Sequence, residues 1–419
     1  MKAQRLTSSG SGFLVTAALV LFLTGAALAA PKYKILHNFT GNADGDGGNA
    51  LALDRRGNIY GASLGGGSQN CGPGGCGLIY ELTQHAHGKY TFAVLYGFTG
   101  GSDAGSPNSP LLLDASGDLY GTTASGGARG GGTVFELTPG AGGWTQTVLY
   151  SFCNQLGCVG LPQAGLVMDQ AGNLYGTTPE EPHGGAVYRL ADFSGRWKEA
   201  VLHKFCPNGG GDGYDPFAGL ILDAAGNLYG TTQVGGTGCP GEGCGIVYEL
   251  TPEPGGKWEE AILHRFDNNG KDGYTPGAGA LFMDALGSLY GTTGTGGGAG
   301  YGALFKLSKN ASGRWEETVL HNFSNSSGGS FPDAGVVMDK SGNLYGTTDG
   351  GGGPGCGVIY KLAPAAKGKW KYSVLHTFGN AYDGCLPVGN LAIDSSGNLY
   401  GGTIFGGTGG YGVIFELTP

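Results

Sequence analysis

The sequence predicts an all-β fold, a seven-bladed β-propeller whose blades are four-stranded antiparallel sheets. A short phrase, Ile-Tyr-Gly or Leu-Tyr-Gly, occurs seven times at spacings of 60, 55, 54, 61, 55 and 55 residues. Repeats of this period are typical of stacked or ring-shaped repeat architectures. Each unit holds four short apolar runs without helical periodicity, which indicates strands. The phrase is centred on Tyr60, Tyr120, Tyr175, Tyr229, Tyr290, Tyr345 and Tyr400.

The first two runs of each unit are joined by a tight turn. The first run is apolar on both faces, as in residues 218–223, and an Asp-x-x-Gly turn follows it in every unit, as at Asp223 and Gly226. Aspartate accepts backbone hydrogen bonds in such turns, and glycine takes the conformation that other residues avoid. We therefore interpret this Asp as a turn residue. The second run, Asn-Leu-Tyr-Gly-Thr-Thr, is rich in strand-forming residues.

The third and fourth runs form a hairpin, and the two ends of the chain share one blade. The third run reads Gly-x-Val-Tyr-Glu-Leu, as in residues 245–250, and the fourth ends on Leu-His-x-Phe, as in residues 263–266. Four such runs joined by short turns predict an antiparallel meander. The chain begins with a solitary fourth strand, 33–39, and ends after a third strand, 413–417. Pairing these two strands would complete the seventh blade and close the ring.

Residues 1–29 are typical of a secretory signal peptide, and residues 30–419 form the propeller of about 55-residue repeats. Lys2 and Arg5 supply the basic start, residues 13–23 the apolar centre, and residues 27–29 the small-residue cleavage site. The apolar run is short for a membrane span. We expect a secreted or periplasmic monomer that has no membrane insertion after signal removal and no C-terminal anchor.

The mature protein is acidic and rich in glycine. Loss of Lys2 and Arg5 with the signal peptide changes the net charge from -9 to -11. An acidic exported protein is poorly suited to nucleic acid or anionic membranes. The 90 glycines recur in register with apolar residues, a pattern that argues against disorder.

The chain has nine cysteines, a number that fits an oxidising compartment. Three local pairs share a C-x4-C spacing, without the histidines or second pairs of a zinc site. Disulfides are therefore the favoured interpretation, and the odd number leaves at least one thiol unpaired within the monomer. The disulfide candidates are Cys71, Cys76, Cys153, Cys158, Cys239, Cys244, Cys356 and Cys385.

The combined signature Asn-Leu-Tyr-Gly-Thr-Thr, Gly-Val-Tyr-Glu-Leu and Val-Leu-His-x-Phe resembles the GloVer tandem-repeat family of exported bacterial proteins. The resemblance covers residues 31–419 and implies a propeller-like repeat domain, with no activity established for the family. Some members carry a C-terminal sorting anchor, which we do not expect in this chain. The Asp-x-x-Gly-Asn-Leu-Tyr hairpin is also similar to those of NHL and gluconolactonase-type propellers, a likeness of fold that does not fix function.

The longer loops, which join the second strand to the third and the fourth strand to the next blade, should share one face of the disc. Variable loops on a rigid scaffold are the usual place for binding sites. An Asp-x-x-x-Pro pattern in these loops is explained by an Asp-Gly turn, or by a carboxylate ring near the channel mouth that holds Ca²⁺ or a polyhydroxylated or cationic ligand. Its candidate binding residues are Asp103, Asp212, Asp272 and Asp383.

Two further sets of residues are candidates. Asp44 and Asp46, in the corresponding loop of the first unit, could hold Ca²⁺, although Leu53 occupies the position of the closing Glu of an EF-hand. The third unit replaces its glycine loop with a stretch that could bind a metal or transfer protons, or could simply be a solvated short loop. The candidate residues there are Glu180, Glu181 and His183.

The fourth-strand histidines share one repeat position, which favours a structural role over a metal site. They are His37, His203, His264, His321 and His376. No nucleophile elbow or Ser/His/Asp arrangement is recognisable, so we assign no catalytic residue.

The favoured interpretation is an exported, non-enzymatic propeller that binds a ligand or protein partner, such as a saccharide or peptide, through its loop-rich face. The alternative is a metal-assisted hydrolase, lactonase or lyase with carboxylates at the central channel. A third interpretation is a structural or adhesive envelope protein. No cofactor is expected apart from Ca²⁺, which the carboxylates could bind.

Overall fold

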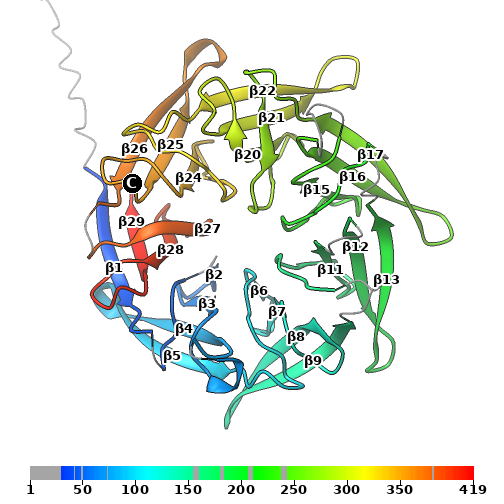
Figure 1. Cartoon of the computed structure of the whole chain (residues 1–419), viewed down its shortest axis with the longest axis vertical. Coiled ribbons are helices and arrows are strands. Elements are labelled where there is room, and N and C mark those ends of the chain that lie inside the picture. The colour runs from blue at the N-terminus through cyan, green and yellow to red at the C-terminus, as the bar shows by residue number, and fades with distance from the viewer. Residues whose placement is uncertain are drawn as a thin grey trace, which may run out of the picture. The chain divides into compact units, whose positions relative to one another are not determined.

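The computed structural model describes residues 30–419 except 42, 49–50, 73, 154–159, 180–183, 206–210, 237–242 and 380–381. Residues 31–419 form one compact unit. Seven antiparallel sheets surround a central axis (Figure 1), which confirms the predicted propeller. We number the blades 1 to 7 along the chain, and the seventh contains both the first and the last strand.

The inner half of each blade consists of a short first strand and a buried second strand. The first strands are β2 (Ala52–Leu53), β6 (Leu112–Leu113), β10 (Val167–Met168), β14 (Ile221–Leu222), β18 (Gly273–Pro276) with β19 (Phe282–Met283), β23 (Val337–Met338) and β27 (Cys385–Ile393). The second strands are β3 (Ile59–Ser63), β7 (Leu119–Thr123), β11 (Leu174–Thr178), β15 (Leu228–Thr232), β20 (Leu289–Gly296), β24 (Leu344–Thr348) and β28 (Leu399–Phe405).

The outer half is a longer hairpin. The third strands are β4 (Leu78–His85), β8 (Gly130–Gly140), β12 (Ala186–Asp192), β16 (Ile246–Glu253), β21 (Ala303–Lys309), β25 (Val358–Pro364) and β29 (Val413–Thr418). The fourth strands are β5 (Lys89–Gly97), β9 (Gly143–Cys153), β13 (Trp197–Lys204), β17 (Lys257–Arg265), β22 (Trp315–Asn322), β26 (Trp370–Thr377) and β1 (Lys32–Asn38). Three short 3-10 turns, η1 (Gln69–Cys71), η2 (Ala86–Gly88) and η3 (Ala366–Gly368), lie in connections.

The ring closes as predicted. β1 pairs antiparallel with β29, from Lys32 opposite Thr418 to Asn38 opposite Val413. Blade 7 therefore takes its outer strand from one end of the chain and its other strands from the opposite end (Figure 1). Because every third strand is then covered by a fourth, no blade presents an unpaired third strand.

The repeated tyrosine joins neighbouring blades. Tyr60 of blade 1 packs in a buried cluster with Leu119 and Phe135 of blade 2. In blade 4, the hydroxyl of Tyr229 donates to Asp223 Oδ2 at 3.1 Å, while Asp223 Oδ1 accepts the backbone N–H of Asn227 at 2.8 Å. The Asp-x-x-Gly turn is thus the hydrogen-bonded turn that the sequence predicts.

The two threonines after the tyrosine have separate tasks. The first donates to the inner strand of the next blade, as from Thr292 Oγ1 to the carbonyl of Ala334 at 2.8 Å. The second caps the third strand of its own blade, as where Val358 N–H donates to Thr348 Oγ1 at 3.2 Å. Both positions are buried, so where these hydrogen bonds form they satisfy groups that water does not reach.

The loop entering each blade is held by the blade before it. The residue preceding the loop proline has positive φ in six units, for example 55° at Thr275, and its N–H donates to the preceding blade, here to the Cys244 carbonyl at 3.0 Å. The proline then packs on Gly245, whose added Cβ would lie 2.6 Å from Pro276 Cδ. The proline of the Asp-x-x-x-Pro pattern therefore has an inter-blade packing role.

Candidate functional site

A cavity of about 730 Å³ lies on the propeller axis. Every blade contributes wall residues from its inner strand region, and these residues are small or apolar: Leu51, Pro110, Leu166, Leu220, Ala280, Ala334 and Leu391. Polar groups are interspersed among them, namely Asp46, Asn108, Gln163, Asp333, Asp349 and Asn390. A cavity of this size with a few convergent polar groups is typical of small-molecule sites.

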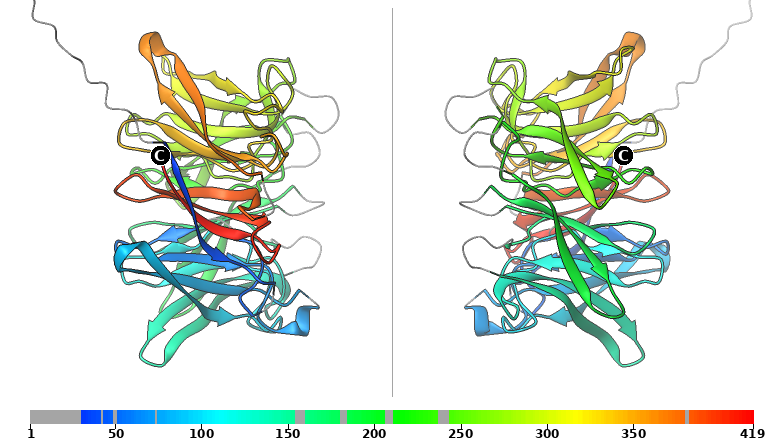
Figure 2. Two further views of the ribbon diagram at one scale, coloured as in Figure 1. Left: turned by 90° about the vertical axis from the view of Figure 1, so that its left-hand side faces the viewer. Right: turned by 90° about the vertical axis from the view of Figure 1, so that its right-hand side faces the viewer.

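The cavity lies toward the loop-rich face. Leu64, Asp349 and Ile404 occupy one repeat position, directly after the second-strand threonine or its equivalent, where the long loops begin. In the edge views, these loops, with η1 among them, project from one side of the disc, and the hairpins between third and fourth strands project from the other (Figure 2). The cavity therefore lies on the face where the sequence predicts a ligand site, which stays a prediction.

Exposed apolar side chains surround part of the cavity. Phe405 is 53% exposed and Tyr411 is 47% exposed, and Leu64 and Ile404 are also largely uncovered. All four contribute to the cavity wall, and Phe217 adds another aromatic ring. Clustered exposed apolar groups on a soluble protein usually mark a binding surface.

Asp333 and Asp349 form a carboxylate pair on the cavity wall. Their backbone N–H groups both donate to the carbonyl of Phe331 at 3.0 Å, which places the two residues side by side. Removal from bulk water, then the charge of Asp333, raises the pKa of Asp349 to about 7. Asp333 is exposed to solvent, yet partial burial of its carboxyl raises its pKa. One of the pair can therefore carry a proton near neutral pH.

The local backbone is shaped to admit Asp333. Gly294 occupies in blade 5 the repeat position that Asp349 occupies in blade 6, and an added Cβ there would lie 2.4 Å from Asp333 Oδ1. The N–H of Gly279 donates to the Asp333 carbonyl at 3.0 Å. The pair thus depends on two glycines of the preceding blade.

Asp44 and Asp46 point to different places. Asp44 Oδ2 lies 3.2 Å from His37 Nε2 and accepts the Thr40 N–H at 3.1 Å, so it closes its own loop. Asp46 lies on the cavity wall and accepts the Gly65 N–H at 2.6 Å. The structure does not bring these two carboxylates together.

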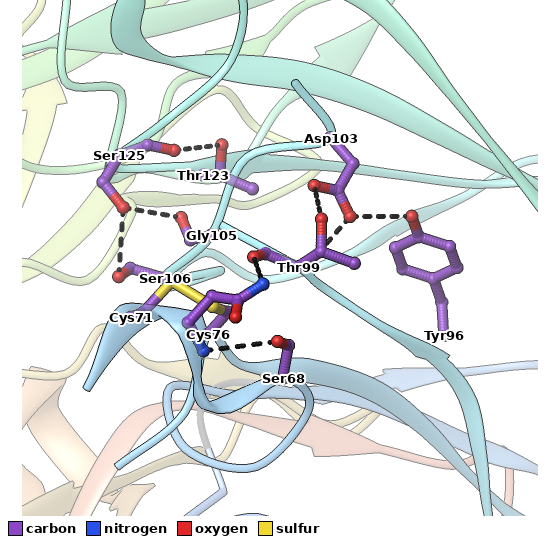
Figure 3. Close-up of a disulfide and its surroundings, with 11 residues drawn as sticks. Ser68, Cys71, Cys76, Tyr96, Thr99, Asp103, Gly105, Ser106, Thr123 and Ser125 are labelled. Carbon is purple, nitrogen blue, oxygen red and sulfur yellow. Dashed lines mark hydrogen bonds between the residues drawn. A yellow bond between two sulfur atoms is a disulfide. The ribbon is translucent and has the colours of Figure 1, made fainter. Parts of the chain in front are cut away.

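The four predicted aspartates of the Asp-x-x-x-Pro pattern lie beside the outer strands. Asp103 accepts the Tyr96 hydroxyl and the Thr99 N–H, each at 2.9 Å (Figure 3). These hydrogen bonds hold the pKa of Asp103 below its ordinary value, against the opposing effect of its partial burial. In the other three, Asp Oδ2 lies 3.1–3.7 Å from Nε2 of the histidine near the end of the fourth strand that precedes the loop. These histidines are His203, His264 and His376. None of the four is among the described residues that line the cavity.

A bulge aims the outer-strand histidines at the next blade. In blade 4, Val247 pairs with His264 and Tyr248 with Ile262, so Leu263 is the extra residue. Because a bulge breaks strict alternation, Leu263 and His264 both face blade 5. The structural role that the sequence predicts for these histidines agrees with this packing.

Two of these histidines also meet a glutamate of the next blade. His203, Asp212 and Glu260 form one group, and His264, Asp272 and Glu317 form another, with donor atoms within 4.8 Å of one another in each. Burial and the neighbouring Asp212 raise the pKa of Glu260 to about 7. Burial and Asp272 raise the pKa of Glu317 to about 8.

Two disulfides are resolved within the described residues. Cys71 and Cys76 are bonded within one loop (Figure 3), as their spacing predicts. Cys356 and Cys385 are also bonded and tie blade 6 to blade 7. Cys153 and Cys244 are disulfide-bonded too. Disulfides of this kind form in oxidising compartments.

Several predicted residues lie outside the described part of the chain. These are Glu180, Glu181 and His183, the cysteines Cys158 and Cys239, and the signal peptide, residues 1–29. Sequence reasoning did not select Asp333, Asp349, Glu260 or Glu317. Asp333 and Asp349 could have been noticed in the sequence because the other units have no carboxylate at these two repeat positions.

A model of the Gloeobacter/Verrucomicrobia repeat matches residues 23–242 and 240–419. The chain belongs to this family. Among solved structures, this chain is similar in fold to a protein from Lactobacillus plantarum. The two have 14% sequence identity and a TM-score of 0.51, over 79% of this chain and 85% of that one. It is also similar to the periplasmic gluconolactonase of Pseudomonas aeruginosa, with 18% identity and a TM-score of 0.50 over 79% and 84% of the two chains.

No curated protein matches this Gloeobacter/Verrucomicrobia repeat chain. The likeness to the two solved structures extends to the propeller fold. Among the described residues, no helix has the length and apolarity needed to cross a bilayer.

Proposed function

We propose that this chain is an exported binding protein that holds a small polyhydroxylated ligand, such as a saccharide, in its central cavity. The observation that carries the proposal is the 730 Å³ cavity, whose lining includes both aromatic rings and hydrogen-bonding groups. Sugar rings present apolar C–H faces that stack on aromatic rings, while their hydroxyls pair with amides and carboxylates. Export is supported by the signal-like start of the sequence and by the disulfides.

The composition of the cavity supports a polar neutral ligand. Phe217, Phe405 and Tyr411 provide the ring faces, and Asn108 and Gln163 lie on the inner edge of neighbouring blades. A protonated carboxyl at Asp349 can donate a hydrogen bond as well as accept one. The site therefore offers both kinds of partner that a sugar hydroxyl requires.

The test is a binding screen of the purified mature protein against mono- and oligosaccharides, read by ligand-observed NMR and by calorimetry. Phe405→Ala should weaken binding by about tenfold or more, because the stacking face is lost. Tyr382→Ala is the matched control, since Tyr382 is exposed but absent from the cavity wall. Absence of any saccharide binding by the wild type would refute the proposal.

A second candidate function rests on the Asp333 and Asp349 pair. Two adjacent carboxyls that share a proton can act as acid and base in the hydrolysis of an ester or lactone. Such a reaction would add water across the acyl C–O bond, with one carboxylate taking the proton of the water. The wild type would then turn over a panel of lactones and esters, and Asp349→Asn would lose at least 100-fold in kcat. Equal rates in the two proteins would reject this function.

A further inference from the structure

Six of the seven blade interfaces share one arrangement at the outer rim. A His or Tyr lies near the end of each fourth strand. In each of these interfaces it contacts a residue of the next blade's fourth strand, the one four positions before that strand's own His or Tyr. In three interfaces that residue is an aromatic ring stacked on the histidine, as for Tyr33 on His376, with ring centroids 3.9 Å apart. The others are Phe92 on His37 and Tyr372 on His321. A stacked ring offers no ligand atom.

Two consecutive interfaces replace the ring with a carboxylate. Between blades 3 and 4 the residue is Glu260, and between blades 4 and 5 it is Glu317. Each faces a histidine and a loop aspartate of the preceding blade. Both groups therefore combine one imidazole nitrogen with two carboxylates from two blades.

The donor atoms of each group are spaced as the ligands of one ion are, although His264 and Asp272 also lie within hydrogen-bond distance of each other. His203 Nε2 lies 3.7 Å from Asp212 Oδ2 and 3.9 Å from Glu260 Oε2, beyond hydrogen-bond range. In the second group, His264 Nε2 lies 3.1 Å from Asp272 Oδ2. Ligands about 2.1 Å from a tetrahedral Zn²⁺ are about 3.4 Å apart, close to these separations.

Unpaired buried oxygens point to a missing partner. The Asp272 side chain is 7% exposed, yet its Oδ1 has no hydrogen-bond partner among the described residues. Glu317 Oε1 in the same group, and Asp212 Oδ1 and Glu260 Oε1 in the other, are also buried and unpaired. Buried carboxylate oxygens are costly unless they are hydrogen-bonded or coordinate a cation.

We propose that His264, Asp272 and Glu317 bind a divalent transition-metal ion such as Zn²⁺, and that His203, Asp212 and Glu260 form a second site of the same kind. The nitrogen-and-carboxylate donor set suits zinc or manganese better than calcium. Each ion would join two blades at the rim. Blade 4, which contributes to both sites, would be fixed to both of its neighbours.

The test is zinc stoichiometry of the untagged mature protein after chelation, measured by competition with a chromophoric chelator. The wild type should bind two equivalents, and Co²⁺ should give the visible absorption of a low-symmetry site. Glu260→Gln and Glu317→Gln should each lose one equivalent. The Co²⁺ spectrum needs no variant, so it also tests the proposal if a substitution impairs folding.

Glu199→Gln is the matched control. Glu199 occupies the same repeat position between blades 2 and 3, but it accepts the Tyr150 hydroxyl at 2.7 Å instead of facing a histidine. This variant should keep two equivalents. If the wild type binds no zinc, or if the double variant Glu260→Gln and Glu317→Gln binds as much as the wild type, the proposal is wrong. A proton shared between carboxyls would then explain the two groups.

Discussion

At the residue scale, the aromatic residue of the third strand packs in the same way in every unit, but the units differ in whether it carries a hydroxyl. The third-strand aromatic is Tyr80, Tyr188, Tyr248 and Tyr360 in four units, all fully buried, and their hydroxyls have no partner among the described residues. The other three units have Phe135, Phe305 and Phe415. The ring packs under the glycine of the repeated phrase, and the hydroxyl adds only a desolvated polar group.

Replacing one of these tyrosines tests this interpretation. Tyr248→Phe should leave the free energy of unfolding unchanged or raise it by about 1 kcal/mol, because no hydrogen bond is lost. Tyr229→Phe should lower it by about 1–2 kcal/mol, since the Tyr229 hydroxyl shares its proton between Glu249 Oε1 at 2.7 Å and Asp223 Oδ2 at 3.1 Å. Chemical denaturation measures both. A larger loss for Tyr248→Phe than for Tyr229→Phe would contradict the assignment.

The raised pKa of Asp349, about 7, predicts a pH dependence of stability. The folded state favours the protonated carboxyl, so this stabilising contribution is complete below the ordinary pKa of about 4 and is lost as pH rises through 7. Asp349→Asn removes the dependence. Its free energy of unfolding relative to wild type should therefore increase by about 1–3 kcal/mol between pH 4 and pH 8.

Denaturation at several pH values checks this expectation. Asp192→Asn, at an exposed strand end, is the control and should leave the wild-type slope unchanged. A wild-type protein whose stability relative to Asp349→Asn does not fall with pH would show that the Asp349 carboxyl is ionised throughout this range.

At the element scale, the glycine before each third strand is a contact point between blades. Gly245 has φ of 89°, and an added Cβ would lie 2.3 Å from the Thr232 carbonyl oxygen and 2.6 Å from Pro276 Cδ. Gly245→Ala should therefore lower the free energy of unfolding by about 2–4 kcal/mol. Gly255→Ala, with φ of 83° but nothing within 4 Å, should cost only about 1 kcal/mol. Equal losses would show that backbone strain alone matters.

The strands could be predicted from the sequence because the same local pattern of strands and turns occurs in all seven units. The turn at Asp223, the tyrosine phrase and the closing strands follow from period and turn chemistry. The candidate sites depend instead on where units differ and on contacts between units. His264 and Glu317 occupy different repeat positions in different blades, so no spacing joins them. One of the two interpretations of the Asp-x-x-x-Pro aspartates put them near the channel mouth, but their outer-strand partners hold them at the rim.

The cavity could be predicted only in part. The sequence predicts a ligand site on the loop-rich face, where the cavity lies. The departure from the repeat that it singles out is in the third unit, at Glu180, Glu181 and His183. The structure places its carboxylate pair in the sixth, at Asp333 and Asp349. Their nearness depends on backbone geometry around Phe331, a residue with φ of 58° that no local pattern specified.

At the scale of the whole molecule, closure depends on a single seam between β1 and β29. A mature chain lacking residues 31–39 should expose the edge of β29 and lose the packing of Tyr33 on His376. We expect association on size-exclusion chromatography and a Tm lower by at least about 10 °C. A synthetic peptide of residues 31–39 added in trans should restore the monomer. A truncated protein that stays monomeric with unchanged Tm would show that the seam is dispensable.

The composite blade also sets an order in time. β1 is the first described strand to be synthesised, and its partner β29 follows every other described strand. The outermost strand of blade 7 therefore has no partner until residues 413–418 have been synthesised. The ring cannot close before that point. A premature stop that removes only this short stretch would leave an almost complete polypeptide with two open edges.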